Sequence, residues 1–144
     1  CVQAAGAAPF HQSFTTDFAE RYVTRAETVA TAIRIGDPAS YDRGVRAIRF
    51  TRGAVVSVPD DAILSAQQQI GVGGVGCEPA SAASVAGVRS AIESGLIKPD
   101  ESVVAVLTGH LLKDPGALAN PNGKGANMPI EIEPTIDAIE RELR

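Results

Sequence analysis

The sequence predicts an α/β protein in which a mostly parallel sheet is flanked by helices. Short, continuous apolar runs at residues 1–6, 54–58 and 102–107 have the length of buried strands. Longer stretches with helical spacing of apolar residues separate them. Continuous apolar strands that alternate with helices are typical of a parallel sheet covered by helices, because both faces of each strand are then buried.

Four helices are expected between and after these strands. Asp37 is a suitable N-cap and precedes a proline, which predicts a helix that ends near Gly53. The other three are expected at residues 60–70, 80–94 and about 134–143. The resulting order (strand, helix, strand, helix, helix, strand, then a final helix) fits one α/β layer followed by a tail.

Four aromatic residues are spaced four apart near the start of the chain. Phe10, Phe14, Phe18 and Tyr22 would lie on one face of a helix. Aromatics make up only 4% of the sequence, so small residues are expected to fill much of the interior. We interpret the four rings as a packing face and not as a ligand box.

Charge and composition exclude several classes of function. The net charge is −4 and the thirteen basic residues form no stripe, so no nucleic-acid partner is expected. No apolar run is long enough to cross a membrane, and no signal-peptide pattern opens the chain. Cys1 and Cys77 match no metal spacing and are interpreted as free thiols of a reducing, cytoplasmic compartment. The chain opens inside an apolar run without a Met, so a piece of a larger protein is expected.

A glycine cluster formally matches the dinucleotide-binding pattern G-x-G-x-x-G. That pattern requires a strand before it and a helix directly after it. Here Gly71, Gly73 and Gly76 follow a predicted helix, and Pro79 interrupts what comes next. We therefore interpret the cluster as a crossing from helix to loop.

Two short patterns predict a ligand-binding edge. CEPASAA at residues 77–83 would open a helix with small residues, which permits close approach of a flat ring and favours negative charge, although plain helix capping is the alternative. Thr108 follows the third predicted strand, where ligands of α/β sheets bind, although a turn residue is also common there. His110 has no evident acid or nucleophile as partner, so a structural role is favoured over that of a general base.

Four pieces of the sequence together resemble threonine synthases. They are QAAGAAP (3–9), ETVATAIRIGDPAS (27–40), CEPASAA (77–83), and LTGH with LKDP (107–115). They occur in the family's order and with similar spacing. The resemblance implies that residues 1–119 form the C-terminal part of the large catalytic domain of a fold-type-II pyridoxal-phosphate enzyme, with residues 120–144 as a tail that carries a short helix.

The resemblance also implies which residues face the cofactor, pyridoxal 5′-phosphate. Thr108 corresponds to the residue whose hydroxyl meets the pyridine nitrogen. Glu78 and Ser81 correspond to the pocket wall beside the ring, and Ala32 and Ile33 to the segment that passes over the cofactor face. The family's Schiff-base lysine and phosphate-binding loop lie in its N-terminal half. No lysine of this chain matches that motif, so no catalytic residue is assigned here.

The implied reaction converts O-phospho-L-homoserine and water to L-threonine and phosphate in threonine biosynthesis. A neutral hydroxyl keeps the ring nitrogen closer to unprotonated than a carboxylate would, because a negative charge stabilises the pyridinium. The resulting weaker electron sink favours elimination and replacement over transamination. The chain alone is expected to be inactive, with the missing N-terminal half as its partner and a homodimer as the intact enzyme.

One departure from the family pattern bears on the site. The position after His110 is usually glycine, and here it is Leu111, which would be strained if the backbone had positive φ. Two alternatives remain for the function: another fold-type-II lyase that resembles serine/threonine dehydratases, or a non-catalytic association domain.

Overall fold

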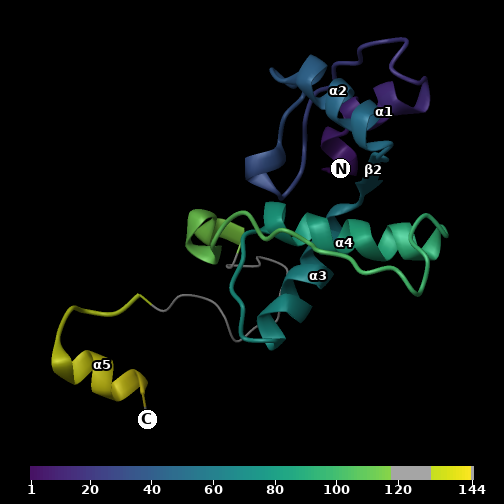
Figure 1. The fold of residues 1–144 in the computed structure, drawn as a ribbon. Helices are drawn as coiled ribbons and strands as arrows, with labels where there is room; N and C mark the ends of the chain where they lie inside the picture. The colour runs from purple at the N-terminus through teal and green to yellow at the C-terminus, as the bar shows by residue number, and fades with distance from the viewer. Residues whose placement is uncertain (118–130, 144) are drawn as a thin grey trace.

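The structure is a computed structural model that describes residues 1–117 and 131–143 (Figure 1). The predicted boundary between residues 119 and 120 and most of the predicted loop 114–129 lie outside the described residues. The elements in chain order are β1 (Val2–Ala4), η1 (Ala5–Ala7), α1 (Pro9–Thr15), η2 (Thr31–Ile33), α2 (Tyr41–Thr51), β2 (Val56–Val58), α3 (Asp60–Val72), α4 (Pro79–Glu93), η3 (Leu111–Lys113), η4 (Pro115–Ala117) and α5 (Ile136–Glu142).

The sheet of the described residues consists of β1 and β2, which run parallel. Val2 pairs with Val56 and Ala4 pairs with Val58. The connection between the strands carries α1, η2 and α2, as a parallel crossover requires a long connection. The α/β class, the parallel pairing and two of the three predicted strands are therefore confirmed.

Helix α4 lies at the centre of the fold. It packs against α3 and also covers both strands of the sheet (Figure 1). Its contact with β1 is close, because a Cβ added to Gly87 would lie 2.2 Å from Val2 Cγ2. The core around it is built mainly from small side chains: Ala4, Ala30, Val58, Ile63, Ala66, Cys77, Ala82, Ala83 and Ala86. The scarcity of aromatic residues in the sequence thus corresponds to layers that approach each other closely.

A second, aromatic cluster lies between α1 and α2. Helix α1 ends at Thr15, and the chain turns back because Asp17 and Phe18 have φ of 53° and 58°. The Phe10 and Phe18 ring centroids are 5.2 Å apart, and Phe10 meets Tyr41 edge-on at 5.6 Å. The rings form a packing cluster, but the prediction that they share one helical face is wrong, because α1 ends before Phe18 and the fourth ring of the cluster is Tyr41 and not Tyr22.

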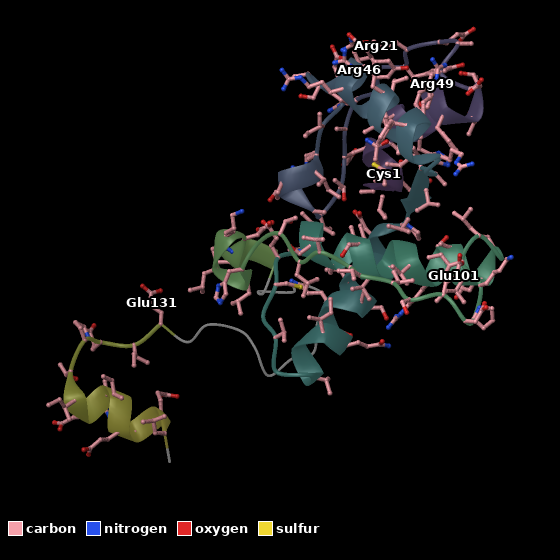
Figure 2. All side chains as sticks on the ribbon, in the orientation of Figure 1. Cys1, Arg21, Arg46, Arg49, Glu101 and Glu131 are labelled. Atoms are coloured by element: carbon pink, nitrogen blue, oxygen red, sulfur yellow. The ribbon has the colours of Figure 1, made fainter. Side chains whose placement is uncertain are left out.

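Arginine side chains cover this aromatic cluster on its outer side (Figure 2). The Arg21 guanidinium lies 4.9 Å from the Tyr41 ring centroid, and that of Arg49 lies 5.8 Å from the Phe18 ring. The Asp37 carboxylate accepts a hydrogen bond from Arg21 at 2.5 Å. Asp37 was predicted to cap α2, but α2 begins at Tyr41 and the residue at its N-cap is Ser40, while the Asp37 side chain pairs with Arg21.

The prediction of a third buried strand at residues 102–107 is wrong for this chain. The segment is extended, but it forms no strand, and its side chains are largely exposed, with Val104 at 88%. A strand is an element only when a neighbouring strand accepts and donates its backbone hydrogen bonds. Within the described residues no strand lies beside this segment.

Candidate functional site

The first turn of α4 forms the floor of the candidate site. Glu78 occupies the N-cap position with φ −70° and ψ 158°, and Pro79 opens the helix. Proline suits this position because its missing N–H would have no partner in the helix. Ser81 and Ala82, in the first turn of the helix, are 1% and 0% exposed. The CEPASAA pattern therefore gives a buried helix start made of small residues.

Ser81 joins this helix start to the Thr108–Gly109 segment. The Gly109 N–H donates to Ser81 Oγ at 2.8 Å, and Ser81 Oγ lies 3.2 Å from Thr108 Oγ1. The Glu78 N–H donates to the Gly109 carbonyl at 3.1 Å. Glu78, Ser81 and Thr108, which were predicted from distant parts of the sequence, are therefore brought together.

The Glu78 carboxylate is buried beside Gly109. Glu78 is 4% exposed, and its Oε1 lies 3.7 Å from Lys113 Nζ. A Cβ on Gly109 would lie 1.8 Å from that same Oε1, so a larger residue at 109 would force the carboxylate to move. Since a buried carboxylate requires a compensating partner, the Lys113 ammonium balances its charge from the solvent side.

The segment that contains Ala32 and Ile33 reaches the same end of α4. Element η2 packs on α4, and Ile33 packs against the core beneath it. Ala32 is exposed. The Thr31 hydroxyl donates to Asp114 Oδ2 at 2.6 Å, which links η2 to the segment that follows Gly109. The structure therefore joins Glu78, Ser81 and Thr108 directly, and it places Ala32 and Ile33 on η2, which packs on the same helix.

Four further residues hold this arrangement and were given no role from the sequence: Asp60, Gly109, Lys113 and Asp114. Asp60 Oδ1 accepts from the Thr28 hydroxyl at 2.5 Å, and Oδ2 accepts from the Val29 N–H at 2.9 Å. Asp60 lies in the first turn of α3 and so joins this helix to the Thr28–Val29 segment. The other three lie within the 107–115 pattern, but their contacts are long-range, and only the fold reveals them.

Leu111 is not strained. Within the described residues, the non-glycine positions with positive φ are Asp17, Phe18 and Arg52, so the concern about Leu111 was wrong. Its side chain lies against Gly76, where an added Cβ would approach Leu111 Cδ2 to 1.8 Å. The glycine at 76 thus provides the space that the Leu111 side chain fills.

His110 has a structural position, as the sequence predicted. It forms an isolated antiparallel bridge with Cys77, and its Nδ1 accepts from the Leu112 N–H at 3.2 Å, which caps η3. Both cysteines are free, with Cys1 exposed and Cys77 buried. Burial raises the pKa of the Cys77 thiol, and the Glu78 charge raises it further. A thiol in this state is a weak nucleophile.

Fold and site together define a class of enzyme. Residues 1–109 match the model of the pyridoxal-phosphate dependent enzyme family, and the chain belongs to that family. Pyridoxal phosphate is the cofactor that membership implies. The matched range ends at Gly109, whose N–H donates to Ser81 Oγ. It therefore includes the contacts of Ser81 with Thr108 and Gly109, which we call the Ser81–Thr108 joint.

The most informative relatives among curated proteins are threonine synthases. The chain is 46% identical to that of Methanosarcina acetivorans over 118 residues, which is 81% of this chain and 28% of the relative. It is 48% identical to that of a Bacillus species over 82% of this chain and 34% of the relative, and 37% identical to that of Methanocaldococcus jannaschii over 99% and 35%. The chain thus spans about a third of the length of these relatives.

A likeness to a solved structure supports the fold. The crystal structure of a threonine deaminase from T.th. superposes with a TM-score of 0.53 at 20% identity, over 68% of this chain and 34% of that chain. At this identity the likeness shows the fold alone. The chain therefore has the architecture of part of a fold-type-II enzyme.

The residues present fit one edge of the cofactor. Thr108 is exposed while its hydroxyl is held by the buried Ser81, so its oxygen keeps one bonding direction for a ligand. The helix start beside it is made of small residues, Ala80, Ser81, Ala82 and Ala83. Over residues 1–117 and 131–143, no cluster of His, Cys, Asp or Glu could hold a metal ion. Among the described helices, none is long and apolar enough to cross a membrane.

Proposed function

We propose that this chain is the C-terminal portion of a threonine synthase and supplies one wall of its pyridoxal-phosphate site. The observation that carries the proposal is the Ser81–Thr108 joint, which presents a neutral hydroxyl at the end of α4. It lies within segments shared with threonine synthases. The reaction of the complete enzyme would convert O-phospho-L-homoserine and water to L-threonine and phosphate.

In this proposal each site residue has a limited task. Thr108 holds the pyridine nitrogen without adding charge, so the ring remains a moderate electron sink. Glu78 and Ser81 keep Thr108 in place and form the wall beside the ring. Ala32 and Ile33 cover one ring face. The cofactor supplies carbanion stabilisation when bound, and the lysine that carries it belongs to the N-terminal portion.

The proposal includes the surroundings of the enzyme. The N-terminal portion of a threonine synthase is the partner that completes the site, the complete enzyme is a homodimer, and the location is cytoplasmic. The separate chain should be inactive. Borohydride treatment of the chain with pyridoxal phosphate, followed by mass spectrometry, should find no cofactor fixed to Lys98, Lys113 or Lys124. A cofactor fixed stoichiometrically to one of them would show that the chain carries its own site.

A chimera tests the reaction. Residues 1–119 of this chain would replace the matching segment of the Methanosarcina acetivorans enzyme, to which 118 residues align. The chimera should release phosphate from O-phospho-L-homoserine and form threonine. The unaltered relative is the control for assay conditions. A chimera that folds and binds the cofactor, yet only deaminates threonine, would favour the dehydratase alternative. One that folds and does neither would favour an association domain.

A further inference from the structure

Two carboxylates from different parts of the fold hold the short segment that contains η2. Asp60, in the first turn of α3, accepts a hydrogen bond from the Thr28 hydroxyl. Asp114, at the end of η3, accepts one at its Oδ2 from the Thr31 hydroxyl at 2.6 Å. The entry to η2 is therefore fastened to α3, and the first residue of η2 is fastened to the segment that follows Thr108.

The contact between Thr31 and Asp114 is the polar link between these two parts of the candidate site. Among the described residues, the other hydrogen bonds of residues 30–34 stay within residues 28–35. Ala32 follows Thr31 directly and is exposed, so little packing fixes its position. The place of Ala32 beside the Thr108 segment therefore depends on the Thr31–Asp114 hydrogen bond.

Asp114 itself has a defined position, because the turn that carries it is anchored on α4. The Asp114 N–H donates to the Leu111 carbonyl at 3.3 Å, which closes η3. The preceding residue, Lys113, reaches the other way, and its Nζ lies 3.7 Å from Glu78 Oε1 at the N-cap of α4. Two consecutive side chains thus connect one turn to the start of α4 and to η2.

The strength and place of the Thr31–Asp114 hydrogen bond point to a local effect. A distance of 2.6 Å from a hydroxyl to a carboxylate oxygen is typical of a charge-assisted bond, which is stronger than a neutral one. Thr31 is exposed, however, and an exposed bond adds little to the stability of the whole fold, because water replaces it when it breaks. Its loss should therefore release η2 and leave the core intact.

We propose that Asp114 is a positioning residue that holds η2 beside the Thr108 segment and thereby keeps Ala32 and Ile33 over the cofactor ring. The proposal rests on the proposed function, which assigns Ala32 and Ile33 to one ring face. The role requires a hydroxyl at position 31 and an acceptor at position 114. Without either group, η2 moves away from the ring more often and the cofactor leaves the site faster.

Hydrogen exchange on the full 144-residue chain tests the contact without cofactor or turnover. The readout is exchange of the Ile33 and Arg34 amides, which donate within η2 to the Ala30 and Thr31 carbonyls. Asp114→Ala should speed their exchange about fivefold, while the midpoint of urea unfolding stays that of the parent chain. Asp114→Asn keeps an acceptor oxygen and should restore slow exchange.

Two further variants separate this contact from a general effect of removing charge. Asp100→Ala is the matched control, because it removes an exposed carboxylate from the turn after α4, and it should leave the exchange of η2 unchanged. Thr31→Val combined with Asp114→Ala should be no faster than either change alone, since both remove the same bond. Parent-like exchange in Asp114→Ala, or additive effects in the double variant, would overturn the proposal.

The consequence for the cofactor is measured in the chimera with the Methanosarcina acetivorans enzyme. Release of pyridoxal phosphate after dilution, followed by its visible absorbance, should be about fivefold faster in Asp114→Ala than in the parent chimera, and close to the parent rate in Asp114→Asn. Equal release from the parent and from Asp114→Ala would overturn the proposal, even in a chimera that forms threonine. Faster release that asparagine restores, in a chimera that forms no threonine, would refute the proposed reaction and support the positioning role of Asp114.

Discussion

The N-terminal end of α4 and the segment 102–107 are both apolar and adjacent in space at Thr108, yet they are in opposite states. Around α4, backbone and side chain are paired: Ser81 holds Gly109, and Lys113 balances Glu78. In residues 102–107 the backbone groups have no partner within the described residues, and Val104 is 88% exposed. The difference shows that the contacts of α4 fix the Thr108 end of the segment, while residues 102–107 have no neighbouring strand among the described residues.

The largest effect is expected from filling the space at Gly109. Gly109→Ala puts a methyl group where Glu78 Oε1 lies, 1.8 Å from the new Cβ, so the buried carboxylate must move away from its place. We expect the free energy of unfolding in urea to fall by about 3 kcal/mol. The control is Gly71→Ala in α3, where nothing lies within 4 Å of the added Cβ and stability should be equal or higher. Equal effects of the two changes would contradict the close packing at Glu78.

Removing the Ser81 hydroxyl should have the next largest effect. Ser81→Ala leaves the buried Gly109 N–H without its acceptor, which should cost about 2 kcal/mol in urea unfolding. Ser84→Ala one turn later removes a hydroxyl that only donates back to the helix, at the Ser81 carbonyl, and should change stability by less than about 0.5 kcal/mol. If the two variants unfold alike, Ser81 is not the joint between α4 and Thr108.

A smaller effect is expected from the Cys77 thiol at high pH. Its pKa is raised by burial and by Glu78, so the folded chain holds the thiol proton more tightly than the unfolded chain. This contribution to stability is complete below the ordinary thiol pKa and is lost as pH rises through the raised value. Cys77→Ala should flatten the loss of stability in that alkaline range. In the parent chain, iodoacetamide should modify the exposed Cys1 well before Cys77; comparable rates would contradict the burial.

The smallest effect is expected in the open segment. Val106→Thr replaces a 64% exposed side chain in a stretch without backbone bonds to the described residues, so urea unfolding of the separate chain should change by less than about 0.5 kcal/mol. Val58→Thr, at a 2% exposed position of β2, is the comparison and should destabilise the chain clearly, since it buries a hydroxyl in the core. A large loss from Val106→Thr would mean that the segment is already packed in the separate chain.

The success and failure of the sequence-based predictions follow the same division. Local signals predicted helices at residues 60–70 and 80–94, close to the observed α3 and α4, because caps and periodicity act within one element. The parallel pairing of β1 and β2 also followed from the pattern. The strand prediction for residues 102–107 failed because an apolar run indicates only that burial is favourable. Whether the run forms a strand depends on a neighbouring strand, which the run itself does not provide.

The site could be predicted in part. A small-residue helix start and a threonine after an apolar run indicated where to look, and resemblance added Ala32 and Ile33. The contacts that hold the site were not predictable, because Glu78 with Lys113 and Thr31 with Asp114 join residues far apart in the chain. Their positions depend on how η2 and the Thr108 segment meet α4. The roles of these residues toward the cofactor remain predictions.

The hydroxyl of Thr108 provides the most direct measurement of the central claim. In the chimera with the Methanosarcina acetivorans enzyme, phosphate release from O-phospho-L-homoserine would be compared between Thr108 and Thr108→Val, which keeps the shape and removes the hydroxyl. The account predicts that kcat falls at least tenfold, while the visible absorbance of the bound cofactor changes its pH dependence. Unchanged kcat and an unchanged spectrum would contradict the claim that this chain supplies the wall of the site that contacts the pyridine nitrogen of the cofactor.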